Sequence, residues 1–222
     1  MTFLNINHTP HAELRQKIIN TAQKMNALGI NQGKSGNVSA RANNGFLITP
    51  TGIPYDETKP EQIVATELDG SFAGDVLPSS EWRFHADIYR SRADVRAIVH
   101  THSTFATTLA CLGKNIPAFH YMIAAAGGAD IRVAPYATFG TQALSDNAMA
   151  ALDGRNACLL AQHGMIAVGA TLEKALALAV EVESLSRMYW QALQIGEPPI
   201  LDDAEMAIVI EKFRTYGQQL KL

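Results

Sequence analysis

Residues 157–168 read Ala157-Cys158-Leu159-Leu160-Ala161-Gln162-His163-Gly164-Met165-Ile166-Ala167-Val168. Two short apolar runs flank a polar turn, which predicts two paired strands, because apolar runs of strand length bounded by turn residues are typical of buried β-structure. Four other segments are predicted as strands, at 45–49, 62–66, 96–101 and 131–134. Short connections join several of them, so we expect a largely antiparallel sheet.

Segments with helical periodicity lie among these strands. They predict helices at 10–28, from about 79 to 88, and at 103–111, 142–152, 171–193 and 202–214. In the second helix Glu81, Phe84, His85 and Ile88 share one face, so Glu81 is expected to point inward. The sequence contains no linker or repeat, and it predicts a single α/β domain over residues 1–222. We expect a three-layer α/β/α arrangement whose central, largely antiparallel sheet is flanked by helices.

The composition of the 222-residue chain is that of an ordinary globular protein, with 47% hydrophobic and 18% charged residues. Its net charge of −3 provides no basic surface for nucleic acid. No signal-peptide pattern and no apolar run of about 20 residues is present, so we expect a cytoplasmic protein that does not bind membranes. The two cysteines, Cys111 and Cys158, lie between apolar neighbours and are predicted to be buried thiols rather than a disulfide.

Glu81, His100, His102 and His163 form a candidate metal-binding set, since one carboxylate and three imidazoles complete a tetrahedral ligand set. Residues two apart in a strand point to the same face, so His100 and His102 could bind one ion. Each residue also has an ordinary interpretation. The His-x-His pair could be structural, and His163 could be a turn residue. A buried Glu81, however, needs a cation or hydrogen-bond donors.

A candidate anion site comes from three segments that end predicted elements. They are Gly36-Asn37-Val38-Ser39, Thr49-Pro50-Thr51-Gly52 and Ser79-Ser80. Small hydroxyl or amide side chains, glycines and a helix N-terminus suit a phosphate group. The alternative for each segment is ordinary helix capping or turn formation. Neither of the common glycine-rich nucleotide-binding motifs is present.

Long stretches of the chain, in order, resemble the class II aldolase/adducin family. They are Asn31-Gln32-Gly33, Gly36-Asn37-Val38-Ser39, residues 47–55, Pro78-Ser79-Ser80-Glu81-Trp82-Arg83-Phe84-His85, residues 120–128, residues 134–141 and Lys212-Phe213-Arg214-Thr215-Tyr216-Gly217. Two departures, Lys34-Ser35 and Thr101, touch no expected ligand. The resemblance covers nearly the whole chain and implies a central sheet with flanking helices.

The resemblance also implies the site. His100, His102 and His163 would hold one Zn²⁺ per subunit, with Glu81 as a movable fourth ligand and as the acid/base. The phosphate pocket would consist of Asn37, Thr51, Gly52, Ser79 and Ser80. A homotetramer with active sites at subunit interfaces is expected, in which Tyr121 comes from the neighbouring subunit and Phe139 and Tyr216 shape the aldehyde end.

The implied activity is reversible cleavage of a ketose 1-phosphate, with L-fuculose 1-phosphate as the expected substrate, to dihydroxyacetone phosphate and an aldehyde such as L-lactaldehyde. Tyr121 would accept the C4 hydroxyl proton, and Glu81 would protonate C3. Three alternatives stay open: cleavage of 5-deoxyribulose or 5-methylthioribulose 1-phosphate, sugar-phosphate 4-epimerisation, and a non-catalytic adducin-like interaction domain. An aspartate is expected at position 81 in the epimerases, so Glu81 favours the aldolase.

Overall fold

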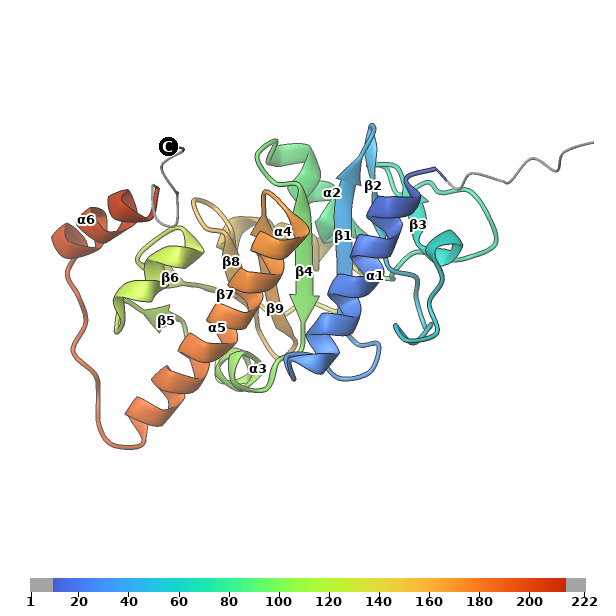
Figure 1. The fold of residues 1–222 in the computed structure, drawn as a ribbon. Helices are drawn as coiled ribbons and strands as arrows, with labels where there is room; N and C mark the ends of the chain where they lie inside the picture. The colour runs from blue at the N-terminus through green and yellow to red at the C-terminus, as the bar shows by residue number, and fades with distance from the viewer. Residues whose placement is uncertain (1–9, 215–222) are drawn as a thin grey trace, which may run out of the picture.

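The computed structural model describes residues 10–214, which form a seven-stranded sheet of order β3-β2-β1-β4-β9-β8-β7 (Figure 1). The strands are β1 (Asn37–Ala42), β2 (Gly45–Ile48), β3 (Val64–Thr66), β4 (Ala97–Thr101), β7 (Val133–Ala134), β8 (Ala157–Leu160) and β9 (Gly164–Gly169). Neighbouring strands are antiparallel except β7 and β8, which are parallel. The prediction of a largely antiparallel sheet is therefore confirmed. A separate two-stranded sheet joins β5 (Ile116–Pro117) to β6 (Asp130–Ile131).

Helices cover both faces of the large sheet. They are α1 (Ala12–Ala27), α2 (Trp82–Ser91), α3 (Thr104–Cys111), α4 (Gln142–Ala151), α5 (Leu172–Leu193) and α6 (Asp203–Phe213), with short 3₁₀ helices η1 (Pro60–Gln62) and η2 (Tyr121–Ala126). Helices α1, α3 and α5 contact one face and α2 and α4 the other. Each face has its own buried apolar cluster. The three-layer α/β/α prediction is confirmed.

The central strand β4 contributes to both apolar clusters. Val99 packs in the cluster under α1, α3 and α5, whereas Ile98 packs in the cluster under α2 and α4. Because side chains alternate along a strand, His100 lies on the Ile98 side, towards α2. Its ring makes an edge contact with Phe84 of α2, with centroids 5.6 Å apart. The sheet therefore presents His100 to the helix whose N-cap is Glu81.

Some predicted elements differ from the observed ones. Strand β1 was not predicted, because its residues Asn37 and Ser39 are polar although the structure buries both. The run 131–134 divides into β6 and β7, which belong to different sheets, and a four-residue run carries no signal of that change of partner. The predicted strand at 62–66 begins only at Val64, after η1.

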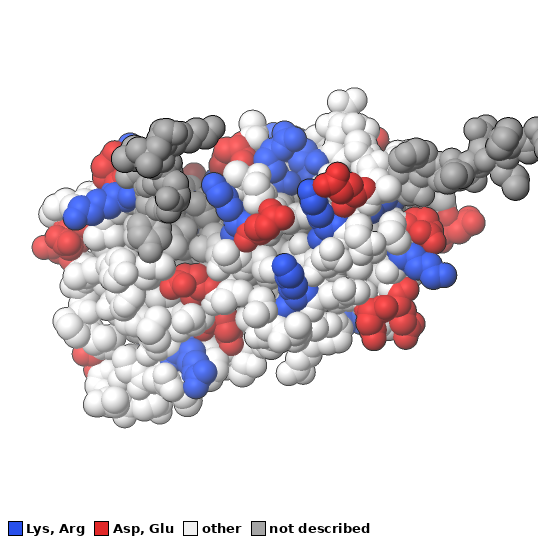
Figure 2. All heavy atoms as spheres, in the orientation of Figure 1, with Lys and Arg blue, Asp and Glu red and all other residues white. Residues whose placement is uncertain are grey.

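The two cysteines differ in exposure. Cys158 is buried as predicted, and burial raises the pKa of its thiol to about 12. The prediction that Cys111 is buried is wrong, because Cys111 ends α3 on the exposed side while Ala106, Leu109 and Ala110 face the core. Acidic and basic side chains are interspersed on the face shown in Figure 2. Within residues 10–214, none of the helices is both long and apolar enough to cross a bilayer.

Candidate active site

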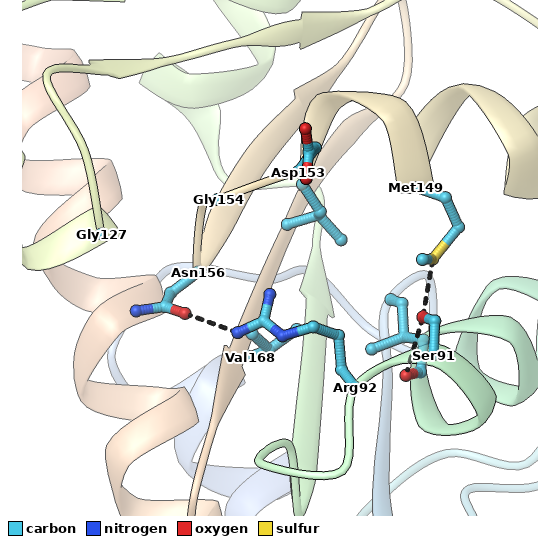
Figure 3. Close-up of a pocket in the computed structure, with 10 residues that line it drawn as sticks. Ser91, Arg92, Gly127, Met149, Asp153, Gly154, Asn156 and Val168 are labelled. Atoms are coloured by element: carbon cyan, nitrogen blue, oxygen red, sulfur yellow. Dashed lines mark hydrogen bonds between the residues drawn. The ribbon is translucent and has the colours of Figure 1, made fainter.

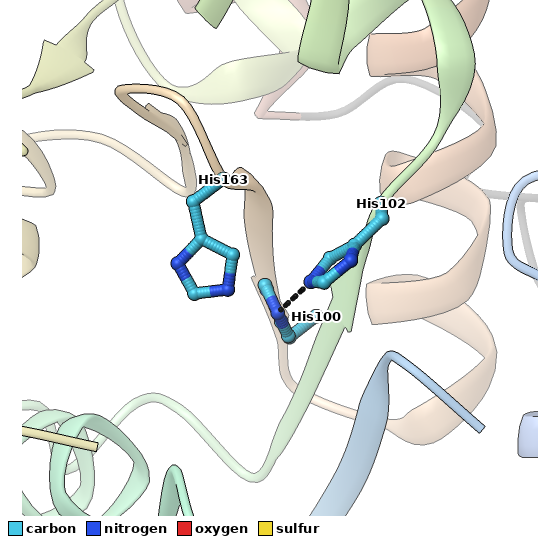
Figure 4. Close-up of side chains that lie close together, drawn as sticks. All are labelled: His100, His102 and His163. Atoms are coloured by element: carbon cyan, nitrogen blue, oxygen red, sulfur yellow. Dashed lines mark hydrogen bonds between the residues drawn. The ribbon is translucent and has the colours of Figure 1, made fainter. Parts of the chain in front are cut away.

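Three histidines from two neighbouring parts of the sheet converge on one point (Figure 4). His100 lies in β4 and His102 directly after it, while His163 lies in the turn between β8 and β9. Strands β4 and β9 are antiparallel partners, with Thr101 opposite Met165, so this turn meets the end of β4. One ring nitrogen from each histidine lies within 4.8 Å of the others, and His100 Nε2 is 3.0 Å from His102 Nε2.

The ring of His100 is fixed by a backbone hydrogen bond. Its Nδ1 lies 2.9 Å from the carbonyl oxygen of Met165, which can only accept, so Nδ1 donates. In the neutral ring Nε2 then carries a lone pair, and this nitrogen faces the other two histidines. Such a hydrogen bond on the far nitrogen is the usual arrangement for a histidine that binds a metal.

Gly164 allows the turn to approach the other two histidines. A Cβ atom at this position would lie 2.4 Å from the carbonyl oxygen of Thr101 and 2.9 Å from Cδ2 of His102. Both distances are shorter than real Cβ contacts, so any larger residue would push His163 away. The glycine after His163 is therefore required for the cluster.

Glu81 adds a carboxylate to this cluster from the N-terminus of α2. Its side chain is buried, with Oε2 3.2 Å from His100 Nε2 and Oε1 3.2 Å from His163 Nε2. Burial raises the pKa of Glu81, but His100 and His163 in their protonated forms outweigh that effect and hold the pKa well below its usual range. The carboxyl group is therefore ionised.

The donor set fits a divalent cation. Three imidazoles and one carboxylate are the usual ligands of Zn²⁺, and ligand atoms around a tetrahedral zinc lie roughly 3.3 Å apart. The 3.0 and 3.2 Å separations here are close to that spacing. Among the described residues, Glu81 Oε1 is buried without a hydrogen-bond partner, although it is charged. A cation would satisfy that oxygen.

Burial also affects the neighbouring histidines. For His102, burial together with the nearby charges of His100 and His163 lowers the pKa to about 4, although Glu81 acts in the opposite direction. His85 of α2 is completely buried, and burial lowers its pKa to about 3. Both rings are therefore neutral at neutral pH, which His102 requires in order to bind a metal.

The residues predicted to bind phosphate lie around two adjoining loops. The Thr51 N–H donates to the carbonyl of Leu77 at 3.1 Å, and the Ser79 N–H donates to the carbonyl of Thr49 at 3.0 Å. Thr51, Gly52 and Ser80 are exposed and Ser79 is buried. Asn37 instead points to Glu81, with Nδ2 2.9 Å from Oε2.

Lys34 is a cation at these loops that the sequence did not single out as a ligand. Its Nζ donates to the carbonyl oxygen of Gly52 at 2.7 Å and stays exposed. A single lysine three residues before Asn37 belongs to no recognisable sequence motif. Only the folded structure shows that it lies beside these loops. Its charge makes this end of the site suitable for an anion.

A cavity of about 310 Å³ extends from Ser80 and Glu81 to the histidines. Its lining residues are Ser35, Ser80, Glu81, His102, Tyr136, Ala137, Phe139, Gln162 and His163. Phe139 was predicted here, whereas Tyr136 and Gln162 were not. The side chains of Tyr136 and Phe139 are largely exposed and form an aromatic wall.

A larger cavity of about 470 Å³ lies elsewhere and contains none of the predicted site residues (Figure 3). It lies beside α2, α4 and the end of β9, where Arg92 donates to Asn156 Oδ1 at 3.1 Å and to the backbone of Arg155. It holds no cluster of metal ligands among the described residues. The chemistry therefore favours the smaller cavity.

The predicted catalytic residue Tyr121 lies outside this cavity. Tyr121 lies on η2, half exposed, with its ring 4.9 Å from that of His120 and 6.5 Å from that of Phe213. It does not line the cavity that contains Glu81. Tyr216 lies outside the described residues, so its predicted role at the aldehyde end is not tested.

Comparison with known proteins places these observations in context. The family model described as Class II Aldolase and Adducin N-terminal domain matches residues 16–190. The 5-methylthioribulose-1-phosphate/5-deoxyribulose-1-phosphate aldolase of Rhodospirillum rubrum is 56% identical over 209 residues, which cover 94% of this chain and 95% of the relative. The L-fuculose phosphate aldolase of Escherichia coli K12 is 51% identical over 210 residues, covering 94% and 98%.

A solved structure described as L-fuculose 1-phosphate aldolase has the same fold. It superposes with a TM-score of 0.90 and 42% sequence identity, covering 94% of this chain and 99% of that one. The similarity in fold therefore extends over nearly the whole of both chains.

Proposed function

The chain is a member of the class II aldolase and adducin family and is an aldolase, and on that premise we propose that it reversibly cleaves a ketose 1-phosphate to dihydroxyacetone phosphate and an aldehyde. The observation that carries this proposal is the cluster of His100, His102 and His163 around the buried Glu81 carboxylate, whose Oε1 has no hydrogen-bond partner among the described residues. A retro-aldol cleavage leaves negative charge on the substrate, and such a cluster holds the cation that stabilises it.

The histidines and Glu81 would hold one Zn²⁺ per subunit. When bound, the cation would supply positive charge that stabilises the negative charge developing on the substrate as the C3–C4 bond breaks. Glu81 would leave the ligand set when substrate enters, take up a proton at the cavity that its carboxyl group lines, and deliver that proton to C3.

Tyr121 is proposed to accept the C4 hydroxyl proton in a neighbouring subunit's site. Its exposure, and its absence from the lining of the cavity in its own subunit, support that assignment. The proposal therefore includes a homotetramer with active sites at subunit interfaces. The cytoplasmic location expected from the sequence stays a prediction.

The phosphate group is proposed to bind between the two loops at Thr51, Gly52, Ser79 and Ser80, with Asn37 at its inner end. The hydrogen bonds that join these loops, and the ammonium group of Lys34 beside Gly52, support this location. Ser80 also lines the cavity that contains Glu81. Phosphate bound there would direct the sugar carbons towards the histidines.

Two classes of substrate are candidates: L-fuculose 1-phosphate on the one hand, and 5-methylthioribulose or 5-deoxyribulose 1-phosphate on the other. The relative at 56% identity is named for the second pair, and those at 51% identity for the first. The aromatic wall of Tyr136 and Phe139 favours an aldehyde with an apolar end. We therefore propose the methylthio or deoxy substrate as the preferred one, with L-fuculose 1-phosphate as the second candidate.

The experiment is an aldol assay of the purified protein with dihydroxyacetone phosphate and single aldehydes. Methylthioacetaldehyde, acetaldehyde, lactaldehyde and glycolaldehyde should all be tested, each with and without a chelator. We expect products with at least one aldehyde, loss of activity with the chelator and recovery on adding Zn²⁺. Full activity in the metal-free protein would refute the metal-dependent mechanism, and a preference for lactaldehyde would favour L-fuculose 1-phosphate.

A further inference from the structure

A continuous chain of buried hydrogen bonds leads from Glu81 into the layer between the sheet and α2. Asn37 Nδ2 lies 2.9 Å from Glu81 Oε2, and Asn37 Oδ1 lies 2.6 Å from His85 Nε2. His85 Nδ1 lies 2.6 Å from Ser39 Oγ, which is 2.8 Å from the hydroxyl of Tyr89. All five residues are at most 5% exposed, so water does not compete for these contacts.

Strand register places the inner members of this chain on one face. Asn37 and Ser39 are two residues apart in β1, so both point towards α2. Asn37 lies directly opposite His100 of β4 in the antiparallel ladder. The same face of the sheet therefore carries a histidine of the cluster and the first link to His85.

The direction of every hydrogen bond follows from its acceptor. The ionised Glu81 carboxylate can only accept, so the Asn37 amide donates to it and turns its carbonyl towards His85. A carbonyl also only accepts, so His85 Nε2 carries the proton. In the neutral ring Nδ1 then accepts from the Ser39 hydroxyl, and Ser39 in turn accepts from Tyr89.

Aromatic packing fixes the His85 ring. It stacks on Phe84 with centroids 4.5 Å apart and interplanar angle 25°, and on Phe46 with centroids 6.3 Å apart and interplanar angle 13°. The ring has no exposed area. It therefore offers the Asn37 amide one fixed donor.

We propose that His85 is a positioning residue for Glu81: by donating to the Asn37 carbonyl, it fixes the amide orientation that holds the Glu81 carboxylate against His100 and His163. The opposite amide orientation would set the Asn37 carbonyl against the carboxylate, and two acceptors repel each other. This inference rests on the proposed role of Glu81 as a metal ligand and acid/base. In metal sites generally, hydrogen bonds from residues outside the ligand set orient the ligands.

The first test is the protonation of His85 in the metal-free, full-length protein, measured by ¹⁵N NMR of its imidazole ring. We expect a neutral ring protonated on Nε2 at neutral pH. A neutral ring protonated on Nδ1 would overturn the proposal, because Nε2 could then no longer donate to the Asn37 carbonyl. This readout needs neither substrate nor metal.

The second test measures Zn²⁺ affinity by competition with a chromophoric chelator. Replacing His85→Phe keeps a stacked ring but removes both hydrogen bonds, and we expect affinity to fall about 10- to 100-fold. The matched control is Tyr89→Phe, one turn along α2, which removes a buried hydroxyl two links further from Glu81. It should change affinity less than about threefold, while its melting temperature reports a comparable loss of a buried hydrogen bond.

A double mutant separates positioning from general damage. In the Glu81→Gln background the same His85→Phe change should have almost no effect on Zn²⁺ affinity, because the group it positions is no longer a carboxylate. An equal drop in both backgrounds, or none in either, would overturn the proposal. If the unmodified protein had no aldolase activity, while His85 showed the expected protonation and the double mutant the expected result, only the proposed function would be contradicted.

Discussion

Glu183 of α5 accepts a hydrogen bond from the backbone N–H of Phe105, with its Oε1 2.9 Å from that nitrogen. The second oxygen accepts from the N–H of Ala106, also at 2.9 Å. These are first-turn amides of α3, whose N-cap residue Ser103 makes no capping hydrogen bond with its side chain. A carboxylate from α5, far away in the sequence, therefore caps α3. Helix α3 starts two residues after His102.

Replacing Glu183→Ala should lower the free energy of unfolding by about 1–2 kcal/mol, because two helix N-terminal amides lose their acceptor. Urea denaturation followed by circular dichroism measures the change. The control is Glu181→Ala on the same helix, since the structure gives Glu181 no hydrogen bond among the described residues; it should change stability by less than about 0.5 kcal/mol. Equal effects of the two variants would contradict the capping role.

Replacing Glu81→Gln should reduce kcat about 10²- to 10⁴-fold, because the amide cannot transfer the proton at C3. Zinc should still bind through the three imidazoles, at close to one ion per subunit. Aldol assays give kcat and elemental analysis gives the metal content. Unchanged kcat would show that Glu81 does not transfer the proton. Complete loss of zinc would show that its main role is to bind the metal.

Mixing two inactive variants tests whether a neighbouring subunit completes the site. Tyr121→Phe and Glu81→Gln proteins should each be nearly inactive. If subunits are exchanged in equal amounts, about one contact in four joins an intact Tyr121 to an intact Glu81, so about a quarter of wild-type activity should return. Each variant taken alone through the same exchange is the control. No recovery despite proven exchange would place both residues in one subunit's site.

The aromatic wall should select the aldehyde. Replacing Phe139→Ala removes apolar contact at the mouth of the cavity, so kcat/KM for methylthioacetaldehyde should fall about tenfold more than for acetaldehyde. Steady-state aldol kinetics with both aldehydes measure this ratio. The control Ser79→Ala, at the proposed phosphate end, should reduce both values equally. A ratio unchanged by Phe139→Ala would show that the wall does not contact the aldehyde.

Asp87 of α2 should contribute stability that depends on pH. Its Oδ2 accepts from Ser145 Oγ at 2.6 Å and from Gln142 Nε2 at 2.7 Å, both on α4. Burial raises the pKa of Asp87, but these hydrogen bonds and Arg90 outweigh it and hold the pKa below its usual 3.8. Because the folded-state pKa is depressed, the contribution is complete above the unfolded-state value and is lost as pH falls through the folded-state value.

The matching variant is Asp87→Asn, which should lower the free energy of unfolding at pH 7 by about 1–2 kcal/mol. Urea denaturation at pH 7 and at pH 3 checks the pH dependence. The difference between variant and wild type should shrink at the lower pH. A difference that is the same at both values would show that the charge of Asp87 contributes nothing to the α2–α4 contact.

The sequence by itself determined most of the helices and strands and several members of the candidate site. Helical spacing predicted that Glu81 would face inward on α2, and it is buried there. The apolar runs on either side of residues 162–164 predicted the hairpin whose turn carries His163. These are local patterns, because a helix face and a strand pair joined by a short turn are fixed by neighbours in the chain.

Only the tertiary structure decided which of these residues meet. The pairing of β1 with β4 placed Asn37 opposite His100, and the pairing of β4 with β9 brought His163 to the end of β4. Strand β1 gave no strong apolar signal, because Asn37 and Ser39 hydrogen-bond to Glu81 and His85 instead of packing in an apolar cluster. Contacts between residues more than 40 positions apart depend on strand register and helix packing, which no local pattern of residues encodes.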